Sequence, residues 1–347
     1  MLRYLTAGES HGEALMAILE GLPSGLRMAK ETIDSELARR QAGYGRGARM
    51  QIEKDKVKII SGLHKGLTIG SPLGMLIENR DFSIASQPPI FNPRPGHADL
   101  PGILKYGFED ARPVLERASA RETASRVAVG AVCKMLLAEF NIGVSSKVLS
   151  VGGKTAKEAI RKHIDAATGK KDSLGGVFEV AIVGAPAGLG SYSQGVERLN
   201  SRLAQAVMSI PGIKAVEFGL GFECANRFGS RVHDGIYFSK ERGYYRKTNN
   251  AGGIEGGISD GEDIVIRAGM KPIATLNKPL NSVDIRTKKP VSASIQRADT
   301  CAVEAAGVVA EAVAAFVLAR AILEKFGGDC LKDIKQAHRA YLKRISQ

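Results

Sequence analysis

The chain has 347 residues, and its hydrophobic content of 44% and charged content of 24% are those of a soluble globular protein. A chain of this length can bury a large core in one large domain or two ordinary ones. Lys and Arg outnumber Asp and Glu by 49 − 36 = 13. This excess favours an anionic partner, either a polyanion or a small phosphorylated or carboxylated ligand, although such charge can also serve solubility alone.

The chain has four cysteines: Cys133, Cys224, Cys301 and Cys330. They form no Cys-x-x-Cys pair and have no metal-ligand spacing with a histidine, so we expect free thiols in a reducing compartment and no metal site. The N-terminus lacks the basic region and apolar run of a signal peptide. The most apolar stretch, residues 301–320, contains Glu304 and Glu311, which predicts a buried helix and no membrane span.

The first elements in chain order are a helix, a loop and two strands. Apolar spacing predicts a helix over residues 32–41, and three glycines predict a loop over residues 42–50. Alternation of apolar and polar residues predicts a strand over residues 56–64, and residues 68–79 are predicted to form a turn and then a strand.

A proline-rich segment separates these strands from a long helix. Residues 87–102 contain five prolines, which excludes regular structure, and the segment is too apolar for a flexible linker. Residues 119–140 are predicted to form a long helix with one apolar face.

The second half of the chain loosely repeats this order. Residues 252–272 are predicted to form a turn and a strand, and residues 297–326 a second long apolar helix. Similar tripeptides, residues 117–119 and 297–299, precede the two helices. We therefore expect one interlocked domain of two similar halves, residues 1–145 and 180–326, followed by a tail over 327–347. Chance similarity of alanine-rich helices is the alternative.

Eight segments place Arg, His or Lys on irregular backbone or at helix starts. They are GESHG (8–12), RRQAGYGRGARM (39–50), NPRPGHAD (92–99), ERASARET (116–123), RVHDG (231–235), GGIEGGISDG (252–261), MKPIATL (270–276) and QRAD (296–299). Arginine binds phosphate or carboxylate with a planar fork, glycine exposes backbone N–H groups, and helix N-termini add positive charge. Together the segments predict a convergent anion-binding cavity.

Simpler interpretations remain open for single residues. Arg40, Arg46 and Arg49 can form a solvated basic face, and His11 and His97 can be structural histidines. The sequence contains neither the Gly-x-Gly-x-x-Gly of a Rossmann fold nor a P-loop motif, which disfavours both folds.

The segments resemble the chorismate synthase family in content, order and spacing. GESHG, GYGRGARM, RPGHAD, ERASARETASRVAVGA, HDGI, GGIEGGIS and the RAD before Cys301 carry the resemblance, which spans residues 3 to 325. It implies an α/β (α+β) fold, a β-α-β-α sandwich with pseudo-symmetric halves, and assembly as a homotetramer. It also implies the 1,4-anti elimination of phosphate from 5-enolpyruvylshikimate 3-phosphate to chorismate, with reduced FMN and no net redox change.

The resemblance also implies roles for individual residues. His11 is expected to protonate the departing phosphate, His97 the reduced flavin, and Asp299 to help a flavin nitrogen accept the ring proton. The expected substrate-binding residues are Arg40, Arg46, Arg49, Arg94 and Arg121. The expected FMN-binding residues are Arg117, Ala118, Ser119, Pro211, Gly212, Gly256, Lys271, Pro272, Ile273, Ala274, Thr275 and Arg297. The family often has Asn-Ala where this chain has Pro211-Gly212, so a contact there must differ.

Two other classes of function are weighed against this one. A nucleic-acid-binding protein is disfavoured because the arginines are dispersed and aromatic residues make up only 5% of the chain. An ordinary flavin oxidoreductase would consume one reductant per turnover. The sequence shows no added reductase domain, so we expect an outside reductant for FMN, with NADPH as a candidate. We also expect a cytoplasmic protein that binds no membrane.

Overall fold

The computed structural model describes residues 1–47, 54–296 and 299–346. Within these residues, the long strands form two four-stranded antiparallel sheets. The first sheet has the order β1-β2-β6-β3 and contains β1 (Arg3–Ala7), β2 (Ala14–Glu20), β3 (Val57–Ser61) and β6 (Leu73–Glu78). The second sheet has the order β7-β8-β14-β9 and contains β7 (Gly143–Val151), β8 (Gly176–Val183), β9 (Ile213–Phe218) and β14 (Ile264–Met270).

Each sheet buries one face, as the two-residue period of its strands requires. In β2, Leu15 and Leu19 are buried, whereas Met16 and Ile18 between them are exposed on the other face. In β8, the buried side chains include Phe178 at 0% exposure. The sheets therefore direct their apolar faces inward, toward the helices.

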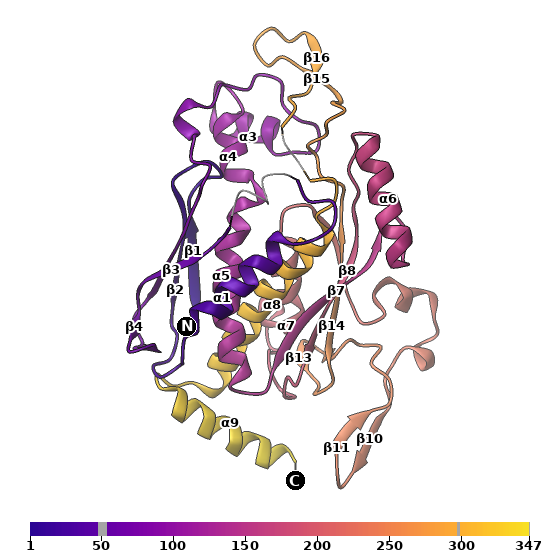
Figure 1. Ribbon diagram of the computed structural model, residues 1–347. Helices are drawn as coiled ribbons and strands as arrows, with labels where there is room; N and C mark the ends of the chain where they lie inside the picture. The colour runs from indigo at the N-terminus through magenta and orange to yellow at the C-terminus, as the bar shows by residue number, and fades with distance from the viewer. Residues whose placement is uncertain (48–53, 297–298, 347) are drawn as a thin grey trace.

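The inner helices lie between the two sheets (Figure 1). They are α1 (Lys30–Gln41), α5 (Thr123–Ala138), α7 (Leu199–Met208) and α8 (Val303–Phe326). Helices α1 and α5 pack on the first sheet, and α7 and α8 pack on the second. The layer order is sheet, helices, helices, sheet, and one hydrophobic core runs through all four layers. The α+β class is thus confirmed, but the layers differ from the expected β-α-β-α order, because both helical layers lie between the two sheets.

Helices α5 and α8 approach each other closely. A Cβ atom on Gly130 of α5 would lie 2.3 Å from the Cα and Cβ atoms of Ala312 in α8. Only glycine permits this spacing. Helix α8 is the one described helix that is long and apolar enough to cross a membrane, and 83% of its most apolar window is buried inside the protein. It is the predicted core helix.

The two halves share one topology. Each contains, in chain order, two strands, a helix, two strands and a helix: β1, β2, α1, β3, β6 and α5, then β7, β8, α7, β9, β14 and α8. In both sheets the fourth of these strands lies between the second and the third. The second set of strands begins at β7, so the boundary expected near residue 180 falls inside β8.

Further helices and short strand pairs lie outside these four layers. The outer helices are α3 (Asp99–Tyr106), α4 (Arg112–Ala118), α6 (Lys157–Gly169) and α9 (Leu331–Ile345). The short strand pairs are β4 (Leu63–His64) with β5 (Leu67–Thr68), β10 (Ile236–Ser239) with β11 (Gly243–Arg246), β12 (Ile254–Glu255) with β13 (Ile258–Ser259), and β15 (Asn281–Val283) with β16 (Pro290–Ser292). The pair β10–β11 and helix α9 extend from the bottom of the sandwich in Figure 1, and β15–β16 from its top.

Three sequence predictions differ from the structure in detail. The proline-rich segment is irregular only as far as Ala98, because α3 begins at Asp99. The strand predicted over residues 56–64 is broken at Gly62, which has a φ of 93°. Cys301 is buried as predicted, but it precedes α8 and is not part of the helix.

Candidate active site

The predicted site residues converge mainly at one end of the sandwich, where α1 ends and α5 and α8 begin. Contacts between these three helix ends define the place: Arg40 of α1 donates from Nε to Thr123 Oγ1, the first residue of α5, at 2.9 Å. Gly47, after α1, donates its N–H to Asp299 Oδ1, before α8, at 2.6 Å. Two helix N-termini and several basic loops therefore lie close together.

His11 lies on the loop between β1 and β2 and is held by Glu116 of α4. The Nδ1 atom of His11 is 2.9 Å from Oε2 and 3.0 Å from Oε1 of Glu116, and the His11 backbone N–H donates to Oε2 at 2.9 Å. Burial by itself raises the pKa of the Glu116 carboxyl, but its hydrogen bonds with His11 outweigh this and hold the pKa below its usual value. Glu116 is therefore an ionised acceptor.

Asn79, which follows β6, fixes the rest of this loop. Its side-chain N–H groups donate to the carbonyl oxygens of Glu9, at 3.2 Å, and Gly12, at 2.7 Å, and its Oδ1 accepts from Arg121 Nε at 2.8 Å. One buried amide thus joins the His11 loop to the arginine cluster.

Arg40 and Arg121 share one buried carboxylate. Arg121 Nη1 donates to both oxygens of Asp55, at 2.6 and 2.7 Å, while Arg40 Nη1 lies 3.5 Å from Asp55 Oδ2. Burial lowers the pKa of Arg40 to about 10, so it stays charged at neutral pH. Within the described residues, these two cations face one carboxylate, and this local positive charge favours an anionic ligand.

Arg46 and Asp299 form an ion pair between the two halves, with Arg46 Nε 3.3 Å from Asp299 Oδ2. Asp299 does not cap α8, because the N-cap position of that helix is Ala302. It instead accepts the Gly47 N–H. Arg49 and Arg297, which are predicted site residues, lie outside the described residues.

A second histidine–carboxylate pair lies on the proline-rich segment. His97 Nδ1 is 2.5 Å from Oδ1 of Asp99, the first residue of α3, and Asp99 is fully buried. Arg94 Nε donates to Asp99 Oδ2 at 2.8 Å, and its Nη1 donates to Thr275 Oγ1 at 2.7 Å. Burial by itself raises the pKa of Asp99, but the hydrogen bonds from His97 and Arg94 prevail and hold it well below its usual range.

The segment after β14 lies against this cluster. Lys271 Nζ donates to the Gly96 carbonyl oxygen, and Lys271 N–H donates to the Gly212 carbonyl oxygen at 2.9 Å. Burial lowers the pKa of Lys271. The structure thereby brings Pro211–Gly212 and residues 271–275 to the segment that carries His97.

The other predicted flavin contacts divide into two places. Arg117, at the end of α4, donates to the Gly8 carbonyl oxygen at 3.2 Å, and Ser119 Oγ accepts the Arg121 N–H at 3.3 Å, so residues 117–119 belong to the His11 side of the site. Gly256 lies in the β12–β13 turn, near the start of β14, whereas Lys271 follows its end. The seven residues of β14, at about 3.3 Å each, span about 23 Å, so Gly256 and Lys271 lie near opposite ends of this strand.

Sequence reasoning missed four residues that organise the site: Asp55, Asn79, Arg112 and Glu116. Glu116 lies inside the ERASARET segment, where the arginines indicate an anion site and the carboxylate by itself does not. Arg112 Nη1 and Arg46 Nε are buried and form no hydrogen bond within the described residues. Such orphaned guanidinium N–H groups fit a site that takes anionic ligands, including phosphate and carboxylate groups.

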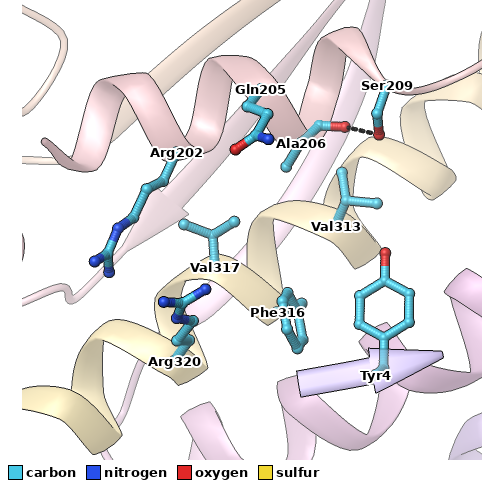
Figure 2. Close-up of a pocket in the computed structure, with 9 residues that line it drawn as sticks. All are labelled: Tyr4, Arg202, Gln205, Ala206, Ser209, Val313, Phe316, Val317 and Arg320. Atoms are coloured by element: carbon cyan, nitrogen blue, oxygen red, sulfur yellow. Dashed lines mark hydrogen bonds between the residues drawn. The ribbon is translucent and has the colours of Figure 1, made fainter. Parts of the chain in front are cut away.

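A cavity of about 260 Å³ lies elsewhere, between β1, α7 and α8 (Figure 2). Its lining residues are Tyr4, Arg202, Gln205, Ala206, Ser209, Val313, Phe316, Val317 and Arg320. Its two arginines both pair with Glu324, at 2.5 and 2.8 Å, and Arg202 also pairs with Glu197, so two carboxylates face the two arginines. The cavity contains none of the predicted site residues, and its neutralised arginines make it a poor anion site.

The fold and these clusters define an enzyme of the α+β class. Its site for anionic ligands consists of basic side chains that are held in place by hydrogen bonds to carboxylates. The family model of chorismate synthase matches residues 2–323. A chorismate synthase of Thermoanaerobacter pseudethanolicus is 58% identical, covering 98% of each chain, and one of Geobacter metallireducens is 51% identical, covering 99% of this chain and 98% of its own. A crystal structure of chorismate synthase has a TM-score of 0.83 and 43% identity, covering 99% of this chain and 98% of its own.

The chain therefore belongs to the chorismate synthase family. Members of this family are lyases of the shikimate pathway, which leads to the aromatic amino acids. The resemblance of the sequence motifs is confirmed.

Proposed function

We propose that the protein forms chorismate and phosphate from 5-enolpyruvylshikimate 3-phosphate, with reduced FMN bound at the site between α1, α5 and α8. One observation of the structure supports this most directly: two histidines, His11 and His97, each contact a buried carboxylate within a cluster of basic side chains. This arrangement suits proton transfer to anionic ligands.

In this proposal the histidines are proton donors. His11 protonates the departing phosphate, and its loop, which contains Gly8 and Gly12, leaves room for a ligand. With reduced FMN bound, His97 would hold a proton for the flavin, and its contact with Asp99 orients the imidazole ring. Asp299 would assist a flavin nitrogen in accepting the ring proton of the substrate.

The arginines neutralise the substrate, which carries one phosphate and two carboxylates. We assign this role to Arg40, Arg46, Arg49, Arg94 and Arg121. Arg46 is suited to direct contact, because its buried Nε forms no hydrogen bond within the described part of the chain and has only the 3.3 Å ion pair with Asp299 there. Arg40 and Arg121 supply the excess charge around Asp55.

FMN is itself an anionic ligand, and when bound in its reduced form it supplies an electron transiently to the allylic system. We assign its binding to residues 117–119, Pro211–Gly212, residues 271–275, Gly256 and Arg297. Lys271, close to Gly96, is suited to neutralise negative charge on the flavin side. Because Gly256, in the β12–β13 turn, lies at the opposite end of β14 from Lys271, its contact with FMN requires a second copy of the chain in the proposed tetramer.

We further propose that the chain is a single domain of two interlocked halves, that it assembles as a homotetramer in the cytoplasm, and that it binds no nucleic acid. FMN is then reduced by an outside reductant, with NADPH as its candidate source of electrons. The continuous core through both halves supports the single domain.

Anaerobic incubation with substrate, FMN and dithionite, followed by assays of chorismate and phosphate, tests the activity. The proposal expects both products in equal amounts, with many turnovers per reduced flavin. One reductant consumed per product would instead identify an ordinary flavin oxidoreductase. Equal turnover in air without any reductant would contradict the flavin requirement.

A further inference from the structure

Glu116 holds more than one atom of His11. Its carboxylate accepts from the His11 backbone N–H, which fixes the loop, and lies within 3.0 Å of Nδ1, which fixes the ring. Glu116 is buried, with 2% exposure, and Ser10 N–H donates to its carbonyl oxygen at 3.0 Å. The loop and the ring therefore have one common support on α4.

The chemistry of this contact sets the position of the proton on His11. An ionised carboxylate can only accept a hydrogen bond, so Nδ1 must carry the proton that lies between the two groups. The two ring nitrogens of histidine are distinct, and the hydrogen bond of one decides the role of the other. Nε2 is then the nitrogen directed away from Glu116, and Asp81 Oδ2 lies 3.9 Å from it.

We propose that Glu116 is a positioning residue that holds the Nδ1 proton of His11, so that the imidazolium form of His11 gives its Nε2 proton to the departing phosphate and is left neutral with its remaining proton on Nδ1. The inference rests on the proposed function of His11. Arg112, 3.5 Å from Glu116 Oε1, partly neutralises the carboxylate, and its contact from Nε to the Pro88 carbonyl oxygen anchors it independently.

Kinetics of two single variants and their combination test the inference. Glu116→Gln keeps the size of the side chain and removes its charge. We expect kcat to fall by about 10- to 100-fold, within the range of general acid catalysis, with an unchanged KM. In a His11→Gln background the same change should have no further effect on kcat, because Glu116 acts through His11.

A matched control is Glu179→Gln in β8. Glu179 is also a buried carboxylate, and it forms ion pairs with Lys147 and Arg267 on the outer face of the second sheet. The substitution removes the charge from these ion pairs, as Glu116→Gln does from the contact with His11. We expect it to keep the wild-type kcat. A full effect of Glu116→Gln in the His11→Gln background would show a merely structural role and overturn the inference, as would a wild-type kcat in Glu116→Gln.

A spectroscopic measurement reads the proton directly. In protein labelled with ¹⁵N-histidine, with the His11 signals identified by their loss in His11→Gln, neutral His11 should carry its proton on Nδ1. A proton on Nε2 instead would overturn the inference. The NMR measurement does not depend on turnover and therefore tests the role of Glu116 separately. Failure of the assay for chorismate and phosphate would overturn the proposed function instead.

Discussion

The Nε atom of Arg46 lies 3.3 Å from Oδ2 of Asp299, across the boundary between the two halves of the chain. The same carboxylate accepts the Gly47 N–H through its other oxygen. Asp299 thus holds the loop after α1 beside the start of α8, and a role as the cap of α8 is excluded because that helix begins four residues later.

Replacing Asp299 by Asn separates its structural contact from its charge. Asparagine keeps an oxygen for the Gly47 N–H but accepts no proton, so we expect nearly unchanged melting and a single-turnover rate lower by at least about tenfold. Asp333→Asn, on the exposed face of α9, is the control. A wild-type rate in Asp299→Asn would mean that the ring proton leaves by another route.

Arg46→Ala should weaken substrate binding more than flavin binding. A charge-assisted hydrogen bond contributes about 1.5–3 kcal/mol, which corresponds to about a tenfold to hundredfold rise in Kd. Titration of substrate in the presence of oxidised FMN measures this, with Arg339→Ala on α9 as the exposed control. An unchanged substrate Kd would mean that Arg46 only forms the ion pair with Asp299 and does not bind substrate.

His11→Ala and His97→Ala should each lower kcat by about 10- to 10⁴-fold while the protein stays folded. Both side chains lie on loops and are partly exposed, at 16% and 19%, so little packing is lost. His64→Ala, in the exposed strand β4, should keep full activity. Wild-type rates in both loop variants would refute the assignment of the proton donors.

Asp99→Asn should destabilise the protein in a pH-dependent way. The pKa of Asp99 is lowered in the folded state, so its contribution to stability is present above the unfolded pKa, about 3.9, and is lost as the pH falls through the folded value. Denaturant unfolding should therefore show a deficit against the wild type at pH 7 that narrows below about pH 4. A deficit that stays constant with pH would mean that Asp99 is not the ionised partner of His97 and Arg94.

Gly130→Ala should destabilise the fold even though alanine is the better helix former. Its Cβ would meet the Ala312 backbone at 2.3 Å, and such overpacking costs about 1–3 kcal/mol, more than the ~1 kcal/mol of helix propensity gained. In Gly169→Ala, at the end of α6, the added Cβ meets nothing within 4 Å, and stability should be kept or raised. Thermal melting compares the two variants.

The sequence by itself determined the family, the two long apolar helices and the segments that carry the site. The apolar face of α5 and the apolar composition of α8 place both helices in the core, because each must bury its apolar surface. The chemistry of arginine, histidine and glycine on irregular backbone marks an anion site before any contact is known.

Only the tertiary structure decided which residues meet. Glu116 lies 105 residues from His11, and Asp299 lies 252 residues from Gly47. Spacing along the chain specifies the face that an element buries and leaves its distant partner undetermined. The His11–Glu116 pair forms because α5, which follows α4, packs on β2, which follows the His11 loop. The Gly47–Asp299 pair forms because α1 and α5 both pack on α8, which brings the end of α1 and the starts of α5 and α8 to one end of the sandwich.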